Sequence, residues 1–134
     1  MRNAEQILTE STTIAVVGAS RDPGKEAHAV PRQIQRHGWT IIPVNPYTTE
    51  LFGVRCYPRL ADIPVHVDLV NVFRPSADCP DVARQAVQIG TDAIWLQQEI
   101  VSPEARAIAE AAGIDYVEDY CIAVERAIHA ISKL

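Results

Sequence analysis

The feature that most constrains the fold is a short apolar run that ends in three small residues. Residues 14–17 read Ile-Ala-Val-Val, which is typical of a strand buried on both faces of a parallel sheet. Gly18, Ala19 and Ser20 follow directly, and small residues let the backbone turn sharply and approach a ligand closely. Because a helical pattern starts near Glu26, this order predicts the phosphate-binding corner of a doubly wound α/β protein. Any strand-to-helix connection favours small residues, so the turn alone leaves a purely structural role open.

Apolar periodicity along the rest of the chain predicts strands that alternate with helices. Further strands are expected at residues 39–44, 54–57, 67–73, 93–96 and 114–117. Helices are expected after an Asn3 cap, from about Glu26, after Ser76 or Asp78, and after Ser102. A last helix is expected to bury a stripe made of Cys121, Val124, Ile128 and Ile131.

Two local expectations concern the first half of the chain. Pro31 lacks an N–H group, so we expect it in or near the first turn of its helix. Residues 47–53 are expected to form a connecting loop. The whole pattern predicts a single α/β domain over residues 1–134, with a Rossmann-like, doubly wound, mainly parallel sheet flanked by helices.

Composition excludes several classes of protein. Hydrophobic residues make up 48% of the chain, enough for a normal core, and no apolar run approaches the roughly 20 residues of a membrane span. The first ten residues lack the apolar core of a signal peptide, and the three cysteines are far apart in sequence. We therefore expect a cytoplasmic protein without a disulfide framework and without a membrane partner.

The charge distribution favours a small anionic ligand over nucleic acid. The formal net charge is −5, which disfavours a nucleic-acid surface. Residues 1–75 carry eight basic and seven acidic side chains, a net of +1, whereas residues 76–134 carry four and ten, a net of −6. The first half of the chain is thus the better receiver for a small polyanion.

The turn after residue 17 departs from the common nucleotide fingerprints. It lacks the glycine spacing of dinucleotide-binding proteins, and the strand at 39–44 ends without the acid that holds a ribose. An oxidoreductase that uses NAD(P) is therefore disfavoured but stays open, and no P-loop sequence is present. Arg21 and Lys25 follow the turn, and such cations suit a ligand with several phosphates.

At this point the chain resembles a known family. The segments VVGASRDP, HGWTIIPVNP, LADIP, VDLVNVFRP and AIWLQ resemble those of small stand-alone CoA-binding proteins. That family is similar to the CoA-binding domain of succinyl-CoA synthetase α subunits, and the resemblance covers about residues 10–128. It implies a Rossmann-type fold that binds coenzyme A or an acyl-CoA without the catalytic half of the synthetase.

The resemblance also implies which residues bind the ligand. Together with Arg21, the positions that match the family's motifs are Gly18, Ala19, Ser20, Lys25, Asn45, Pro46, Phe73, Arg74, Pro75 and Gln97. Asn45 and Pro46 are expected near the adenosine part. The chain departs from the family where Gln98-Glu99 replaces a small residue and glycine, and where Tyr120-Cys121 and Glu125-Arg126 replace the usual pairs.

Other readings of single residues stay open. Cys121 follows Asp119 and is a candidate nucleophile for a thiol-dependent acyl carrier, but a small buried residue is the simpler reading. Arg74 is either a ligand contact or a surface partner of Asp78, and Glu99 is weak as a general base. The histidines show no ligand spacing with cysteines or acids, so we expect no metal site. We assign no catalytic residue and no protein partner.

Overall fold

The fold is built on a five-stranded parallel sheet. The computed structural model describes residues 1–134, and the strand order is β2-β1-β5-β6-β7. The bounds are Thr13–Val17 for β1, Thr40–Val44 for β2, Leu69–Val72 for β5, Ala93–Leu96 for β6 and Asp115–Val117 for β7. Every pairing in this sheet is parallel, so each strand returns through a crossover connection.

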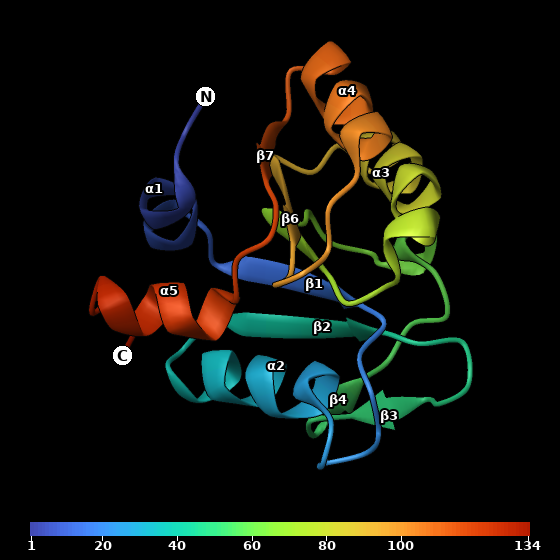
Figure 1. Cartoon of the computed structure of the whole chain (residues 1–134). Helices are drawn as coiled ribbons and strands as arrows, with labels where there is room; N and C mark the ends of the chain where they lie inside the picture. Colours follow the sequence, from blue (N-terminus) through green and yellow to red (C-terminus); the bar gives the residue numbers. More distant parts are fainter.

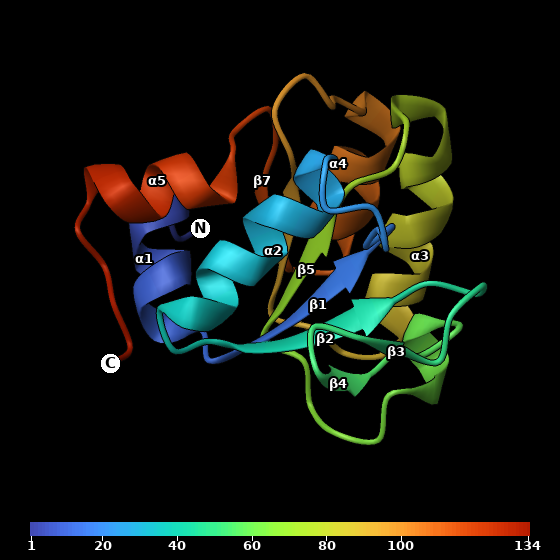
Figure 2. The same cartoon turned by 90° about the horizontal axis from the view of Figure 1, so that it is seen from below.

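Helices cover both faces of the sheet, which confirms the predicted Rossmann-like α/β fold. One layer holds α1 (Ala4–Glu10), α2 (Glu26–Arg36) and α5 (Ile122–Ile128), and the other holds α3 (Cys79–Gln88) and α4 (Pro103–Ala111) (Figures 1 and 2). Two short 3-10 turns, Leu60–Asp62 and Ser76–Asp78, lie in the connections. No helix is long and apolar enough to span a membrane.

Each layer of helices encloses its own apolar core. Ile14 and Val16 pack in the core with α1, α2 and α5, whereas Ala15 between them packs in the core with α3 and α4. Alternate side chains of a strand point to opposite faces, so a strand that helices cover on both faces is a nearly continuous apolar run. This explains the uninterrupted run at residues 14–17.

Two helix starts follow the sequence signals closely. The Asn3 side chain accepts a hydrogen bond from the Gln6 N–H, and the Gln6 side chain accepts one from the Asn3 N–H, a reciprocal capping box. Ser102 caps α4 by accepting from the Ala105 N–H, with Pro103 in the first turn. Both predicted caps are confirmed.

The position predicted for Pro31 is wrong. Pro31 lies in the middle of α2, beyond the first turn. There it cannot donate to the Ala27 carbonyl four residues earlier, and its ring pushes that carbonyl outward. The Ala27 carbonyl instead accepts a hydrogen bond from the Ser20 N–H at 3.1 Å. The proline is tolerated because the loop before the helix uses the acceptor that it frees.

The segment expected to be a loop holds the first strand of a small hairpin, and the second strand lies where a strand was expected, at residues 54–57. Strands β3 (Glu50–Leu51) and β4 (Val54–Arg55) pair antiparallel, and they are joined by Phe52 and Gly53. Both turn residues have positive φ, 59° and 73°, as a tight hairpin turn of this length requires. Phenylalanine is an unusual residue at such a position, so the sequence carried little turn signal.

The stripe predicted for the last helix is also wrong. Val124 is 51% exposed and Ile128 is 67% exposed, whereas Ile122 is buried. Cys121 lies at the N-cap, and Ile131 lies beyond the end of the helix. Only the two ends of the expected stripe, Cys121 and Ile131, pack partly against the core, and the buried residue of α5 is Ile122.

Candidate functional site

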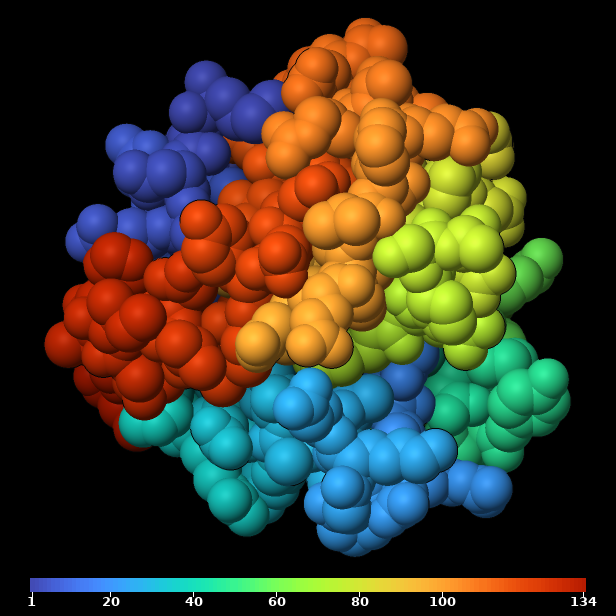
Figure 3. Space-filling view, in the orientation of Figure 1, coloured from blue at the N-terminus to red at the C-terminus, as the bar shows by residue number.

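The carboxyl ends of four strands lie in register at one edge of the sheet. Val17 pairs with Val44 and with Val72, and Val72 pairs with Leu96. The segments that follow these residues therefore start side by side. Figure 3 shows the loops after β1, β5 and β6 meeting on one face of the molecule. All the predicted binding segments lie at this edge, where ligands of open α/β sheets bind.

Gly18 lets two of these segments approach each other. Its φ is +87°, and a Cβ atom placed there would lie 2.6 Å from the Phe73 carbonyl oxygen. The Gly18 N–H donates to the Val44 carbonyl, so the residue still belongs to the sheet's hydrogen-bond ladder. The missing side chain therefore serves first the packing of the β1 turn against the end of β5.

Hydrogen bonds hold the rest of the turn in place. The Asn45 Nδ2 donates to the Ala19 carbonyl at 2.9 Å, which ties the end of β2 to the turn. The His28 Nδ1 lies 2.7 Å from the Ser20 carbonyl oxygen, and the Ser20 N–H donates to Ala27. The turn is thus fixed from β2 on one side and from α2 on the other.

Four backbone N–H groups around the turn donate no hydrogen bond within the protein. They belong to Ala19, Arg21, Glu26 and Ala27. The last two are at the start of α2, where free N–H groups and the helix dipole favour a bound anion. The Gly18 and Ser20 N–H groups are already used, so Ala19 is the one residue of the small-residue turn whose N–H group is free.

The two predicted cations flank these free N–H groups. Arg21 and Lys25 are both exposed, and Lys25 is the N-cap residue of α2. Neither side chain forms an ion pair, whereas half of the ten arginines of the chain do. The corner therefore combines unused backbone donors with unpaired positive charge.

Arg74 forms the surface ion pair that was considered for it, and its contact with a ligand stays a prediction. Its guanidinium lies 2.7 Å from the Asp78 carboxylate in an exposed ion pair. Its Cδ atom lies 3.0 Å from the position that a Gly18 Cβ would take, so its stem covers the turn. Phe73 packs partly against the core, and Pro75 is exposed at the rim. Pro46, after β2, is also exposed.

Gln97 has a structural task that the sequence did not reveal. Its side chain is 3% exposed, and Oε1 accepts from the Asn71 Nδ2 and from the Ile122 N–H, both at 3.1 Å. The backbone N–H is certain to be a donor, which fixes the orientation of the amide. Gln97 thereby holds the start of α5 on the sheet, while its own NH2 group makes no hydrogen bond in the protein.

The loop after β6 contains strained backbone at Glu99, where the resemblance described above leads us to expect glycine. Glu99 has φ +69° and Asp119 has φ +62°, a region that residues other than glycine rarely adopt. The Glu99 N–H donates to Asp119 Oδ1 at 2.6 Å, which joins the loops after β6 and β7. Asp119 does not cap α5, and its side chain holds this loop. Glu99 thus adopts a backbone conformation that glycine would take without strain.

The three cysteine thiols differ in how deeply they are buried. Burial is the main reason why the pKa of Cys79 rises to about 11, and the negative charge of Asp78 adds to it. Burial also raises the pKa of Cys56, against a lowering effect of the contact with Asn45. Cys121 is partly exposed, and its side chain caps no N–H group of α5.

Two surface hollows lie away from the predicted binding residues. One of about 540 Å³ lies beside Thr91, Asp92 and Asp115, where β6 and β7 begin. Another of about 390 Å³ lies between α1, β7 and α5. The chemistry of free donors and cations at the carboxyl edge is the stronger indication of a site, because neither hollow offers it.

The strand order, the crossovers and the small-residue turn place the chain among Rossmann-like α/β proteins. Residues 12–127 match the family described as a CoA binding domain, and the chain belongs to this family. This confirms the predicted relation to the CoA-binding domains of the ligase and synthetase family.

Individual relatives show the same relation. The protein YneT of Bacillus subtilis (strain 168) is 38% identical over 129 residues, which are 96% of this chain and 93% of YneT. The ADP-forming acetate–CoA ligase II of Archaeoglobus fulgidus is 31% identical over 73% of this chain, but the match spans only 15% of the ligase. The structure of cell-free ID.343 from Thermus thermophilus is 35% identical, with a TM-score of 0.90, and the match covers 96% of this chain and 99% of that one.

Proposed function

We propose that this protein binds coenzyme A or an acyl-CoA at the carboxyl edge of its sheet, through a single domain over residues 1–134 and without catalysing a reaction. The observation that carries the proposal is the corner after β1, where four unused N–H groups lie beside the unpaired cations Arg21 and Lys25. Membership of the CoA binding domain family supports the same ligand. We place this activity in the cytoplasm.

The chemistry of the ligand fits this corner. Coenzyme A carries a pyrophosphate and a 3′-phosphate, and backbone N–H groups at a helix start bind phosphate oxygens well. Arg21 and Lys25 would add charge-assisted hydrogen bonds, which are stronger than neutral ones. Asn45 and Pro46 stand at the next strand end for the adenosine part, and Gln97 follows β6 further along the same edge.

A binding role without catalysis is supported by two observations. The match to the acetate–CoA ligase spans only 15% of that enzyme, so most of the ligase has no counterpart in this chain. The Cys121 thiol has no hydrogen-bonded base beside it, in contrast to activated nucleophiles. Calorimetry with Cys121→Ser should therefore show unchanged affinity for coenzyme A.

The main experiment measures the dissociation constants of coenzyme A and dephospho-CoA by calorimetry. A charge-assisted hydrogen bond contributes about 1.5–3 kcal/mol, so Lys25→Ala should weaken coenzyme A by roughly tenfold to a hundredfold. If Lys25 holds the 3′-phosphate, the variant loses the preference for coenzyme A over dephospho-CoA. If it holds the pyrophosphate, both ligands weaken together. Arg21→Ala tests the second cation of the same loop.

Arg36→Ala is the matched control, because Arg36 is an exposed, unpaired cation at the other end of α2. Its removal changes the net charge equally and should change affinity by little more than long-range screening allows. Unchanged binding in both loop variants would remove the cations from the site. Tighter binding of NAD than of coenzyme A by the unaltered protein would overturn the proposed ligand.

A further inference from the structure

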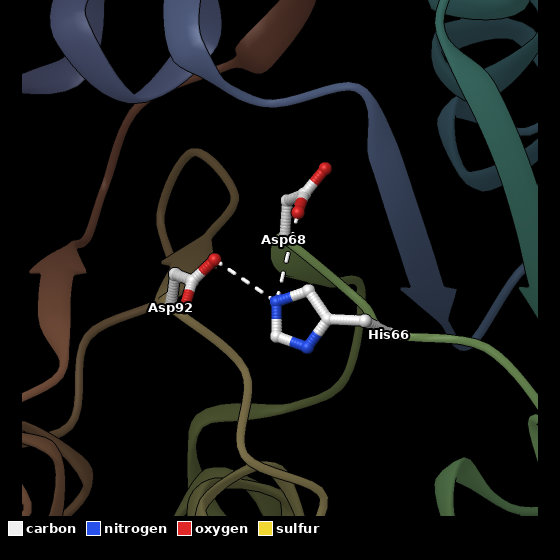
Figure 4. Close-up of side chains that lie close together, drawn as sticks. All are labelled: His66, Asp68 and Asp92. Atoms are coloured by element: carbon white, nitrogen blue, oxygen red, sulfur yellow. Dashed lines mark hydrogen bonds and ion pairs between the residues drawn. The ribbon is translucent and has the colours of Figure 1, made fainter.

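Three metal-ligating side chains converge at the opposite, amino edge of the sheet. Asp68 directly precedes β5, Asp92 directly precedes β6, and His66 lies in the loop before them. The His66 Nε2 is 3.0 Å from an Asp92 oxygen and 3.6 Å from an Asp68 oxygen. Figure 4 shows the imidazole edge pointing between the two carboxylates. Strands β5 and β6 are neighbours, so the sheet itself sets the spacing of the two acids.

Asp68 is held in the orientation that this arrangement needs. Its Oδ2 accepts hydrogen bonds from the Thr12 and Thr13 N–H groups, both at 2.9 Å. Its Oδ1 is the atom turned toward His66. A carboxylate fixed through one oxygen presents the other at a defined place, which is how surrounding hydrogen bonds orient metal ligands.

A second histidine of the chain shows what is special about His66. His129 also lies between two carboxylates, with its Nδ1 at 3.6 Å from Glu5 and its Nε2 at 3.4 Å from Glu125. These acids approach different ring nitrogens, so one ion cannot bind both acids and the ring. At His66 both acids approach the same nitrogen, Nε2, so one ion placed there contacts all three groups.

We propose that His66, Asp68 and Asp92 form a binding site for a divalent transition-metal ion of the zinc type. The three ligand atoms lie within 4.8 Å of one another. Zinc bonds of about 2.0–2.2 Å place neighbouring ligand atoms roughly 3–3.5 Å apart, so small side-chain shifts suffice. The imidazole favours zinc, cobalt or nickel over magnesium, and the ion takes the place of the proton on Nε2.

The site is open to solvent. His66 and Asp92 are more than half exposed and Asp68 is about one quarter exposed, so water completes the coordination. Three protein ligands and an open position are the arrangement of exchangeable metal sites. The site is independent of coenzyme A binding, because it lies at the other edge of the sheet. This proposal takes the place of the expectation of no metal site. That expectation was based on the spacing of histidines, cysteines and acids along the sequence, and it did not consider residues that the starts of two neighbouring strands bring together.

The test is a titration with Co²⁺ followed by absorption, and with Zn²⁺ followed by calorimetry, in a Cys121→Ser background that removes the most exposed thiol. His66→Asn and Asp92→Asn should each weaken binding at least tenfold, with circular dichroism unchanged. His129→Asn is the matched control and should leave the affinity unchanged. Thiolate charge-transfer absorption with Co²⁺, or equal affinity in all variants, would overturn the site.

Discussion

The two edges of the same sheet differ in the sign of their charged side chains and in whether these side chains have partners. At the amino edge the acids are engaged: Asp68 accepts two backbone N–H groups, and Arg2 binds Asp115 at 2.6 Å. At the carboxyl edge Arg21 and Lys25 have no partner, and N–H groups around them are unused. Strand polarity brings free N–H groups of helix starts to one edge only. The comparison teaches that the carboxyl edge is arranged for an anion and the amino edge for a cation.

The largest expected effect compares a glycine at each edge. Gly18→Ala should lower the free energy of unfolding by about 3 kcal/mol or more, because positive φ strain adds to a collision with the Phe73 carbonyl. Gly90→Ala, which precedes β6 at the amino edge, has φ +73° but open space around its Cβ. It should lower stability by only about 1–2 kcal/mol. Urea denaturation measures both.

The difference between the two variants isolates the close approach at the carboxyl edge, since both carry the strain of a positive φ. Equal losses would mean that the contact between the β1 turn and the end of β5 relaxes without cost. The β1 turn would then be more deformable than its hydrogen bonds indicate, and the two edges would differ in charge alone.

A smaller effect is expected at the strained loop after β6. Glu99→Gly removes strain of about 1–2 kcal/mol, partly offset by the greater freedom of glycine in the unfolded chain. The free energy of unfolding should rise by about 0.5–1 kcal/mol in thermal and urea unfolding. The N–H bonded to Asp119 is retained. Gln98→Gly is the control and should lower stability, because Gln98 has no positive φ.

The smallest effect concerns the pH dependence of the amino edge. The hydrogen bond to Asp92 raises the pKa of His66 above its usual value near 6.5, and the charges of Asp92 and Asp68 act in the same direction. The folded state therefore binds the proton more tightly, so this stabilisation is complete below about pH 6.5 and is lost as pH rises through the higher folded pKa. Exposure limits it to less than about 0.5 kcal/mol.

The measurement compares urea unfolding of the unaltered protein and His66→Asn at pH 6 and pH 8. The unaltered protein should lose slightly more stability between these values than the variant, since the other histidines are common to both. A larger loss in the variant would show that His66 is not paired with the acids in solution.

The fold was predictable where a local signal and the tertiary environment agree. The apolar run at residues 14–17 identified β1, and Asn3 and Ser102 marked helix starts through hydrogen bonds within one turn. The position predicted for Pro31 was wrong because the helix tolerates this proline through a hydrogen bond from outside the helix. The Ser20 N–H donates to the Ala27 carbonyl that the proline leaves free. The stripe predicted for α5 was wrong because helical spacing shows which residues share a face but not which face is buried, and α5 buries Ile122.

The site was predictable to the level of segments. Strand ends must share an edge in a parallel sheet, so the segments after β1, β2, β5 and β6 could be grouped without coordinates. Which N–H groups are free, and that Gln97 holds Ile122, depends on hydrogen bonds between distant residues. The cluster of His66, Asp68 and Asp92 was missed because 24 residues separate its two acids.

Pro31 has a consequence for how the phosphate corner could evolve or be redesigned. The Ala27 carbonyl can accept from the loop and from the helix, but Pro31 has no N–H group to donate to it, so the Ser20 N–H is its partner. If alanine replaced Pro31, its N–H would donate to the same carbonyl oxygen, and the Ser20 N–H would then share that oxygen with the helix. Optimising the helix in isolation would thus loosen the loop that carries Arg21. Pro31 thus weakens the helix and leaves the Ala27 carbonyl as an acceptor for the loop.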